Sequence, residues 1–443
     1  MHMFSLSFVY LFLPAMLLLC LILPVRLRPI FLTVISAAYY LLLEEENLIL
    51  LAGVILFDYG MARLMDRCRD FQRLREAIMV CSVVKSIMLI AYYSIMNQLN
   101  GTHVPLGLGV YCLTSMGYLL ECYRGSIRCE RSLPKYALFV GFFPKLYAGP
   151  LVSYSRLKPQ IDSLHLTLKK IGRGAGFFIL GLAKKVILGD TMLTLFQSLQ
   201  SVPTYDTTVL TVWSMVVSMA FAAYFILSGL CDMAKGLGLM FGMELPDNFS
   251  SPYCSLSVNE FFGRFNITVN RFLRRHVYLN LGATQGTMLS GVFNILLVTI
   301  LMGLWFGINV NLLLWGIYFT VFIILERYIL LKYIDFISPF FRWLYCSVTV
   351  LVSFAIFIGK TPADSFEYLK IMFGFGNNVA AIDNRILYLL ASNYLALLAS
   401  AVCTCNLPGK LFSMIKKHAP KFGDALSILI NLLLLALATT FLL

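Results

Sequence analysis

The stretch LMGLWFGINVNLLLWGIYF, residues 301–319, places a Trp–Phe pair between Gly303 and Gly307 inside a long apolar run. An apolar run of about 20 residues is long enough for a helix to cross the hydrocarbon core of a membrane. Glycine and asparagine interrupt such a helix only at some cost. The interruption between Gly303 and Asn311 therefore needs a functional explanation, which the flanking sequence helps to supply.

Similar apolar runs recur along the whole chain. Hydrophobic residues make up 59% of the 443 and charged residues 13%, with a mean hydropathy of +0.82, as is typical of a multi-pass membrane protein. We expect one all-α membrane domain over residues 1–443, with roughly 10–12 transmembrane or re-entrant helices. The clear runs are 5–24, 77–96, 208–230, 287–306, 311–330, 342–359, 386–404 and 425–443, and the shorter or broken ones are 30–57, 105–120, 136–152 and 174–189.

The excess positive charge lies in loops between these runs. Lys plus Arg number 35 against 22 Asp plus Glu, a net charge of +13. Arg26 and Arg28 follow the first run, and five arginines between Arg63 and Arg75 follow the next hydrophobic block. Because basic loops stay in the cytoplasm, this pattern predicts an N-terminus outside the cell. Membrane topology and lipid headgroups explain the charge better than nucleic acid does.

The cysteines do not indicate a metal site or a disulfide framework. Most of the eleven lie inside apolar runs, and Cys403 and Cys405 lack the spacing and second pair of a zinc site. We interpret them as small buried hydrophobic residues and predict no bound metal.

The segment after Pro252 holds the densest set of polar residues near an apolar run. Ser257 followed by Glu260 is a capping box, which predicts a helix from Val258 to about Tyr278. On that helix, Glu260, Arg264, Arg271 and Arg275 would share one stripe, and Asn266 and Asn270 another face. Such a helix suits the wall of a cavity, or it lies along the lipid headgroups; periodicity does not separate the two.

Several motifs in this region resemble the membrane-bound O-acyltransferase family, especially its bacterial alginate O-acetyltransferase branch. SGLCDMA at 228–234 and LPDNFSSPY at 245–253 are similar to the family's SGYSDMA and LPxNFxxPY. FFGRFNITVNRFLRRHVYLNLG at 261–282 is similar to FWRRWHxxLxxWLRDYxYxPLGG. Other matches lie at 105–125, 142–161 and 181–190, so the motif-rich region covers about 105–330 and the order of the family is kept.

The resemblance implies a fold and an activity. Family members form a ring of membrane helices around a central funnel, where a histidine acts as general base on an acceptor hydroxyl. The acyl group comes from a cytoplasmic donor, acyl-CoA or an acyl carrier, and no cofactor is bound. In the alginate branch the acceptor is a glycan outside the cell. The resemblance therefore implies a bacterial inner-membrane protein whose partners are the bilayer, a glycan, and a carrier protein or partner acyltransferase.

One departure from the family pattern falls in the opening stretch. The family histidine belongs to GLWHG, and this chain reads GLWFG at 303–307, so Phe306 stands where the resemblance places the base. A phenylalanine ring cannot accept a proton. The branch's second histidine corresponds to Asn266, whose amide could orient a hydroxyl or polarise a carbonyl, or could simply pack.

Other residues receive roles from the matching motifs. The resemblance implies that Trp305 and Tyr253 line the funnel and that Asp232 is an intramembrane carboxylate of the site. Arg264 and Arg271 could hold a phosphate-bearing donor, or pair with Glu260, which is the commoner role for such arginines. His276 is predicted to pack or to lie at the interface rather than replace the base.

Two functions from different classes follow. The first is transfer of acyl groups to hydroxyls of a cell-surface or secreted glycan, with the base moved elsewhere or replaced by Asn266 and water. The second is a catalytically silent relative that serves as a binding scaffold or translocation path for a partner. A third, weaker hypothesis is a lipid or glycan transporter without acyl chemistry.

Overall fold

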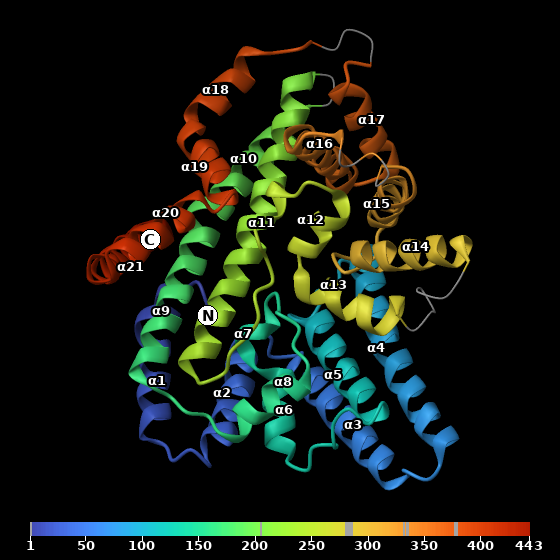
Figure 1. Cartoon of the computed structure of the whole chain (residues 1–443), viewed down its shortest axis with the longest axis vertical. Helices are drawn as coiled ribbons and strands as arrows, with labels where there is room; N and C mark the ends of the chain where they lie inside the picture. Colours follow the sequence, from blue (N-terminus) through green and yellow to red (C-terminus); the bar gives the residue numbers. More distant parts are fainter. Residues whose placement is uncertain (1, 204–205, 280–286, 331–332, 334–335, 376–379) are drawn as a thin grey trace. The chain divides into compact units, whose positions relative to one another are not determined.

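The computed structural model describes residues 2–443 apart from 204–205, 280–286, 331–332, 334–335 and 376–379. The described residues form helices and connecting segments, with no strand among them, which confirms the predicted all-α fold class (Figure 1). The contacts divide the chain into two compact units. The first holds Met1–Leu182, Leu230–Asp247 and Leu442–Leu443, and the second holds Ala183–Gly229 and Asn248–Phe441. That residues 1–443 act as one domain stays a prediction.

Helices α1 to α9 and η1 build most of the first unit. Their bounds are η1 Phe8–Phe12, α1 Leu13–Ile22, α2 Arg28–Leu43, α3 Leu48–Arg67, α4 Gln72–Asn100, α5 Leu108–Tyr123, α6 Leu133–Gly141, α7 Phe143–Leu146, α8 Tyr154–Asp162 and α9 Leu168–Ala183. Helix α11, Val209–Met240, contributes its C-terminal part to this unit. Helices α3, α4 and α5 lie next to one another in Figure 1, and each of the three packs against the other two.

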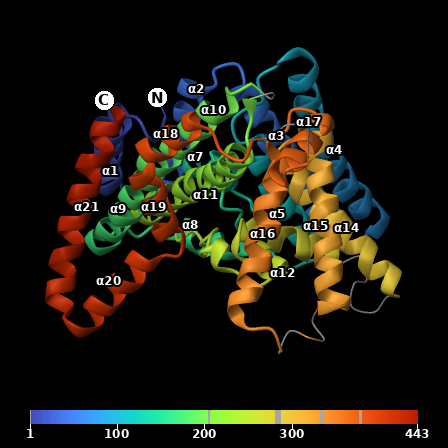
Figure 2. The same cartoon turned by 90° about the horizontal axis from the view of Figure 1, so that it is seen from above.

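The remaining helices build the second unit. Their bounds are η2 Lys184–Gly189, α10 Asp190–Gln200, η4 Pro252–Cys254, α12 Val258–Arg264, α13 Ile267–Leu273, η5 Arg274–Tyr278, α14 Met288–Leu304, α15 Val310–Tyr328, α16 Pro339–Ile358, α17 Pro362–Met372, α18 Asn384–Ser392, α19 Tyr394–Thr404, α20 Leu407–His418 and α21 Pro420–Leu442. Helices α14, α15 and α16 run side by side in Figure 2, with α15 packed against both of the others.

Six of the described helices are long and apolar enough to cross a membrane: α3, α4, α11, α15, α16 and α21. Helices α18 and α19 together pass the same test but bend by 62° at Asn393, whose side chain donates to the carbonyl of Leu389 and ends α18. Three shorter apolar segments are Phe8–Ile22, Arg28–Leu43 and Met288–Leu304. The chain is therefore an integral membrane protein, and the number of complete crossings stays a prediction.

The interruption at 303–311 is the turn of a helical hairpin. Helix α14 ends at Leu304, and Asn309 starts α15 by accepting a hydrogen bond from the Asn311 N–H over 3.0 Å. A Cβ added at Gly303 would collide with the backbone of Leu312, and one at Gly316 would lie 2.8 Å from the backbone of α14. The glycines are thus required because they let the two helices approach closely.

Candidate functional site

The predicted helix start at Val258 is confirmed. The Ser257 hydroxyl accepts a hydrogen bond from the Glu260 N–H over 3.0 Å, and the Glu260 carboxylate accepts one from the Leu256 N–H over 2.8 Å. The first contact satisfies a backbone donor that a helix leaves free at its first turn, and the second ties Glu260 to the residue before the N-cap. The cap therefore fixes Glu260 and Arg264, which form an ion pair one turn apart on α12.

The prediction that this helix continues to about Tyr278 is wrong. Helix α12 ends at Arg264, the chain turns at Asn266 with φ of 51°, and α13 begins at Ile267. Asparagine tolerates this left-handed backbone conformation better than most residues. The shared stripe of Glu260, Arg264, Arg271 and Arg275 therefore does not exist, because the two halves belong to different helices.

A residue from outside the helix causes this turn. Asn248 accepts hydrogen bonds from the Ile267 N–H with its carbonyl and from the Thr268 N–H with its side chain, both over 2.9 Å. Its side-chain amide also donates to the Asn266 amide oxygen over 3.0 Å. Both asparagines are buried. The buried Asn266 side chain thus has a structural partner, and its predicted role toward a hydroxyl or carbonyl stays a prediction.

Phe306 lies in the hairpin turn after α14, inside a cluster of aromatic rings. Its ring centroid is 5.8 Å from that of Phe357, 6.2 Å from Trp315 and 6.5 Å from Phe265. Among the described residues, the ring contacts of Phe306 include no histidine. His276 instead packs on Phe272, with centroids 4.7 Å apart, as the sequence predicts.

The other predicted site residues belong to different elements of the chain, and their shared role at one site stays a prediction. The Tyr253 hydroxyl donates to the carbonyl of Ala220 over 2.7 Å, so its polar group serves the packing of the second unit. Arg271 is exposed on α13, and Trp305 is half-buried beside Phe306. Asp232 belongs to the first unit, whereas the rest belong to the second.

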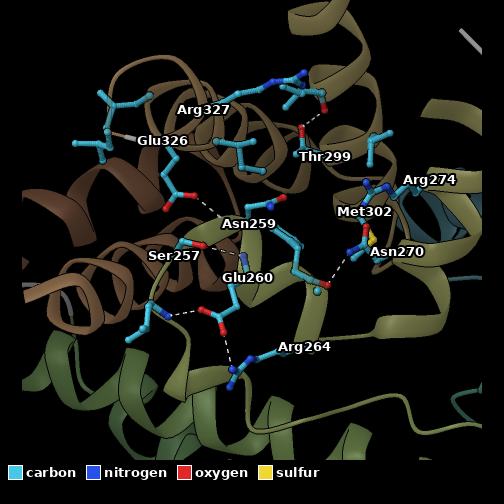
Figure 3. A pocket seen from close by; sticks show the side chains of 18 of the residues that line it. Ser257, Asn259, Glu260, Arg264, Asn270, Arg274, Thr299, Met302, Glu326 and Arg327 are labelled. Carbon is cyan, nitrogen blue, oxygen red and sulfur yellow. Dashed lines mark hydrogen bonds and ion pairs between the residues drawn. The ribbon is translucent and has the colours of Figure 1, made fainter. Parts of the chain in front are cut away.

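A cavity of about 1260 Å³ lies within the second unit, between α12, η5, α14, α15 and α16. Figure 3 shows Glu260 and Arg264 in the lower part of the view, Asn270 beside Arg274 and Met302 at the right, and Glu326 and Arg327 above. Sequence reasoning singled out Glu260, Arg264 and Asn270 but missed the residues from α15 and α16. Arg327 and Arg342 lie near the ends of two apolar runs, where membrane topology alone accounts for a basic residue, so they carry no separate signal in the sequence.

The carboxylates of this cavity already have partners. Glu326 accepts hydrogen bonds from the Val258 N–H over 2.6 Å and the Asn259 N–H over 3.1 Å, so it caps the first turn of α12. Glu260 is paired with Arg264. The positive charge of the lining is therefore only partly balanced by its own acidic groups.

Aromatic rings separate Phe306 from the cavity. Phe262 lines the cavity, and its ring lies 5.9 Å from Trp315, which in turn contacts Phe306. Neither Asn266 nor Phe306 is part of the lining. The aromatic cluster around Phe306 at the hairpin turn and the cavity lined by Arg264, Arg274, Arg327 and Arg342 are therefore separate candidate sites in the second unit.

Comparisons with known proteins agree with the motifs. Residues 126–363 match the membrane-bound O-acyltransferase family. A probable alginate O-acetylase of Pseudomonas aeruginosa is 29% identical over 390 residues, covering 83% of this chain and 74% of that protein. The protein of the same name from Pseudomonas fluorescens is 31% identical, with coverages of 83% and 75%. A peptidoglycan O-acetyltransferase of Helicobacter pylori is 26% identical, with coverages of 78% and 73%.

Proposed function

The chain belongs to the membrane-bound O-acyltransferase family, and from this premise we propose that it serves O-acetylation of a bacterial cell-surface or secreted polysaccharide. Relatives similar over most of the chain are named for the acetylation of alginate and of peptidoglycan. In this proposal the donor is an acyl-CoA or an acyl carrier, and the acceptor is a glycan hydroxyl. The protein would lie in the inner membrane with its N-terminus outside.

The proposal includes a limit on the chemistry of this chain. A positioned general base accelerates proton transfer by about 100- to 10,000-fold. Phe306, which occupies the position that the motif gives to the base, is surrounded by Phe265, Trp315 and Phe357. In this proposal the chain by itself transfers acyl groups slowly. The aromatic surroundings of Phe306 are the observation that supports this limit.

The test compares native protein with Phe306→His in transfer of labelled acetyl groups to a polysaccharide. We expect the histidine variant to be faster by about 100-fold or more, because an imidazole supplies the missing proton acceptor. Phe357→His is the matched control, since it places an imidazole in the same cluster at a position outside the motif. Equal rates for native protein and Phe306→His, with native rates as high as those of a histidine-bearing relative, would contradict the proposal.

A second candidate function is that of a silent scaffold for a separate acyltransferase. The observation that favours it is the hydrogen bond from Asn248 to the Asn266 amide oxygen. Asn266 stands at the second histidine position of the motif, and its amide oxygen is already engaged by this bond. Under this hypothesis, Phe306→His gives no transfer, while a co-purified partner restores it. Transfer by Phe306→His alone would reject the scaffold.

The predicted orientation has its own test. A membrane-impermeant label reacts with a cysteine introduced before Phe8 in intact cells if the N-terminus is outside. Protection of that cysteine, together with labelling of one introduced beside Arg69, would reverse the orientation.

A further inference from the structure

The arginine-rich cavity of the second unit is separate from the position at which acyl chemistry is expected. Phe262 and Trp315 lie between it and Phe306, and the cavity draws its lining from α12, η5, α14, α15 and α16. A volume of about 1260 Å³ is somewhat above the roughly 300–1,000 Å³ that is typical of small-molecule sites, so the cavity has room for a large ligand. The charges and apolar side chains of its lining indicate which class of ligand it can bind.

One part of the lining is cationic. Arg274, Arg327 and Arg342 line the cavity together with the paired Arg264. Within the part of the chain that the structure describes, Arg274 and Arg327 form no ion pair, and the Arg327 guanidinium donates to the Tyr278 hydroxyl over 2.8 Å. The buried Nε of Arg342 has no hydrogen-bond partner there, although Glu326 is near enough to interact with the guanidinium. These guanidinium groups can therefore receive an anionic ligand.

The other part of the lining is apolar and reaches the surface. Ile295, Val298 and Met302 of α14 and Ile323 of α15 all line the cavity. At the rim, Phe341 is 62% exposed and Leu279 is 50% exposed. Large apolar side chains at a rim are unfavourable beside water but favourable beside lipid chains. The mouth of the cavity is therefore suited to the bilayer rather than to the aqueous phase.

The position of the cavity along the helices supports this interpretation. Arg327 lies at the C-terminal end of α15 and Arg342 in the first turn of α16, and both helices are long and apolar enough to span the membrane. The cavity thus lies where two candidate spans end, which is where lipid headgroups are expected. Clusters of arginine at helix ends favour the cytoplasmic side, where anionic lipids give the leaflet a negative surface potential.

We propose that this cavity binds an acidic glycerophospholipid. Its phosphate would contact Arg274, Arg327 and Arg342, and its acyl chains would cover the apolar wall formed by α14 and α15. Basic pockets between transmembrane helices are known to select acidic headgroups in this way. A coenzyme A donor also carries phosphate, but it offers no long apolar group to cover the exposed rim. The inference goes beyond the proposed function and does not depend on acyl transfer by this chain.

The experiment measures lipid binding to the purified full-length protein by native mass spectrometry. Micelles are supplied with phosphatidylglycerol or with phosphatidylcholine of identical acyl chains, and binding is compared between native protein and Arg327→Gln/Arg342→Gln. We expect phosphatidylglycerol to bind preferentially and the double variant to bind it roughly 30-fold more weakly, because each arginine contributes several-fold. Arg385→Gln, an exposed arginine on α18 outside the cavity, is the matched control and should bind as native.

Three outcomes would overturn the proposal. Equal retention of the two lipids would show that the headgroup charge is not recognised. An unchanged affinity in the double variant, with its thermal unfolding in detergent like that of native protein, would place the lipid elsewhere. Displacement of phosphatidylglycerol by coenzyme A would assign the cavity to the acyl donor instead.

Discussion

Two clusters in this protein have opposite chemistry. In the first unit, the fully buried Asp58 of α3 receives Lys85 of α4 at 2.5 Å and the hydroxyl of Ser115, which is itself 2.8 Å from the Tyr136 hydroxyl. In the second unit, Phe306 sits among three aromatic rings. The first cluster joins three helices through one carboxylate and a fourth through Ser115, whereas the second joins a hairpin turn to its neighbours through ring contacts.

The difference teaches where this protein keeps its polar groups. An ionised side chain in an apolar interior persists only when it is paired or has a function that requires it. Asp58 satisfies the first condition, because it joins α3 to α4 and α5, and Ser115 extends the contact to Tyr136 of α6. At position 306 the family motif leads us to expect an ionisable side chain with a catalytic function. This chain has the apolar ring of Phe306 there instead. The polar group of the first cluster thus supports the architecture, whereas the second cluster is held by ring contacts.

The largest expected effect is the loss of the buried ion pair. Asp58→Asn leaves Lys85 without its carboxylate, so we expect a destabilisation of about 3–5 kcal/mol in detergent-based thermal unfolding. The matched control is Asp162→Asn, which breaks a half-exposed pair with Lys135 and should change stability by about 0.5 kcal/mol or less. If the two variants unfolded alike, Asp58 would not be an architectural residue.

The next effect concerns the turn between α12 and α13. Asn248→Ala removes the side chain that accepts from Thr268 and donates to Asn266, leaving buried groups unsatisfied. We expect a loss of about 3 kcal/mol. Asn384→Ala, at an exposed asparagine, provides the comparison. A loss no larger than that of Asn384→Ala would mean that Asn248 does not hold the turn.

A buried carboxylate of the first unit gives a pH-dependent effect. Burial alone would raise the pKa of Glu130, but hydrogen bonds from Tyr154, the Ser132 N–H and Lys158 outweigh it and lower the pKa to about 2. Glu130→Gln should cost about 2 kcal/mol at neutral pH. Because the native pKa is depressed, the stabilisation is complete above about pH 4.5 and is lost as pH falls toward 2.

The corresponding measurement follows thermal unfolding of native protein and Glu130→Gln across that range. The difference in stability between native protein and Glu130→Gln should become smaller as the pH falls. If this difference in stability stayed constant from pH 7 to pH 3, the contacts of Glu130 would not depend on the charge of its carboxylate.

The smallest expected effect distinguishes the contribution of the Asn266 backbone conformation to stability from that of its side-chain contact. Both Asn266→Ala and Asn266→Gly remove the contact with Asn248, but only glycine adopts φ of 51° without strain. The alanine variant should therefore be less stable by about 1 kcal/mol. Equal unfolding temperatures would indicate that the turn relaxes in both variants.

The sequence predicted those features that depend on nearby residues. The helical fold class follows from the apolar runs, the start of α12 follows from Ser257 and Glu260, and the two helices around Phe306 follow from the run boundaries. The turn at Asn266 could not be predicted from helical periodicity, because Asn248 fixes it from 18 residues away. The pairing of Glu326 with the first turn of α12 likewise joins segments 68 residues apart.

The cavity escaped sequence reasoning for the same physical reason. Its walls come from segments separated along the chain, and only packing brings Arg274, Arg327 and Arg342 to one space. Each arginine alone looks like an ordinary basic residue at the end of an apolar run. A charge at such an end is expected from topology, so it carries no information about a site until its neighbours are known.

The pH dependence of acetyl transfer by native protein and Phe306→His tests the central claim most directly, because a proton acceptor reveals itself by its titration. We predict that the histidine variant becomes faster as pH rises through about 6.5, where an imidazole loses its proton, and that the native rate stays low without that inflection. A native protein that transferred rapidly and titrated like an imidazole would contradict the claim that Phe306 leaves the site without a base.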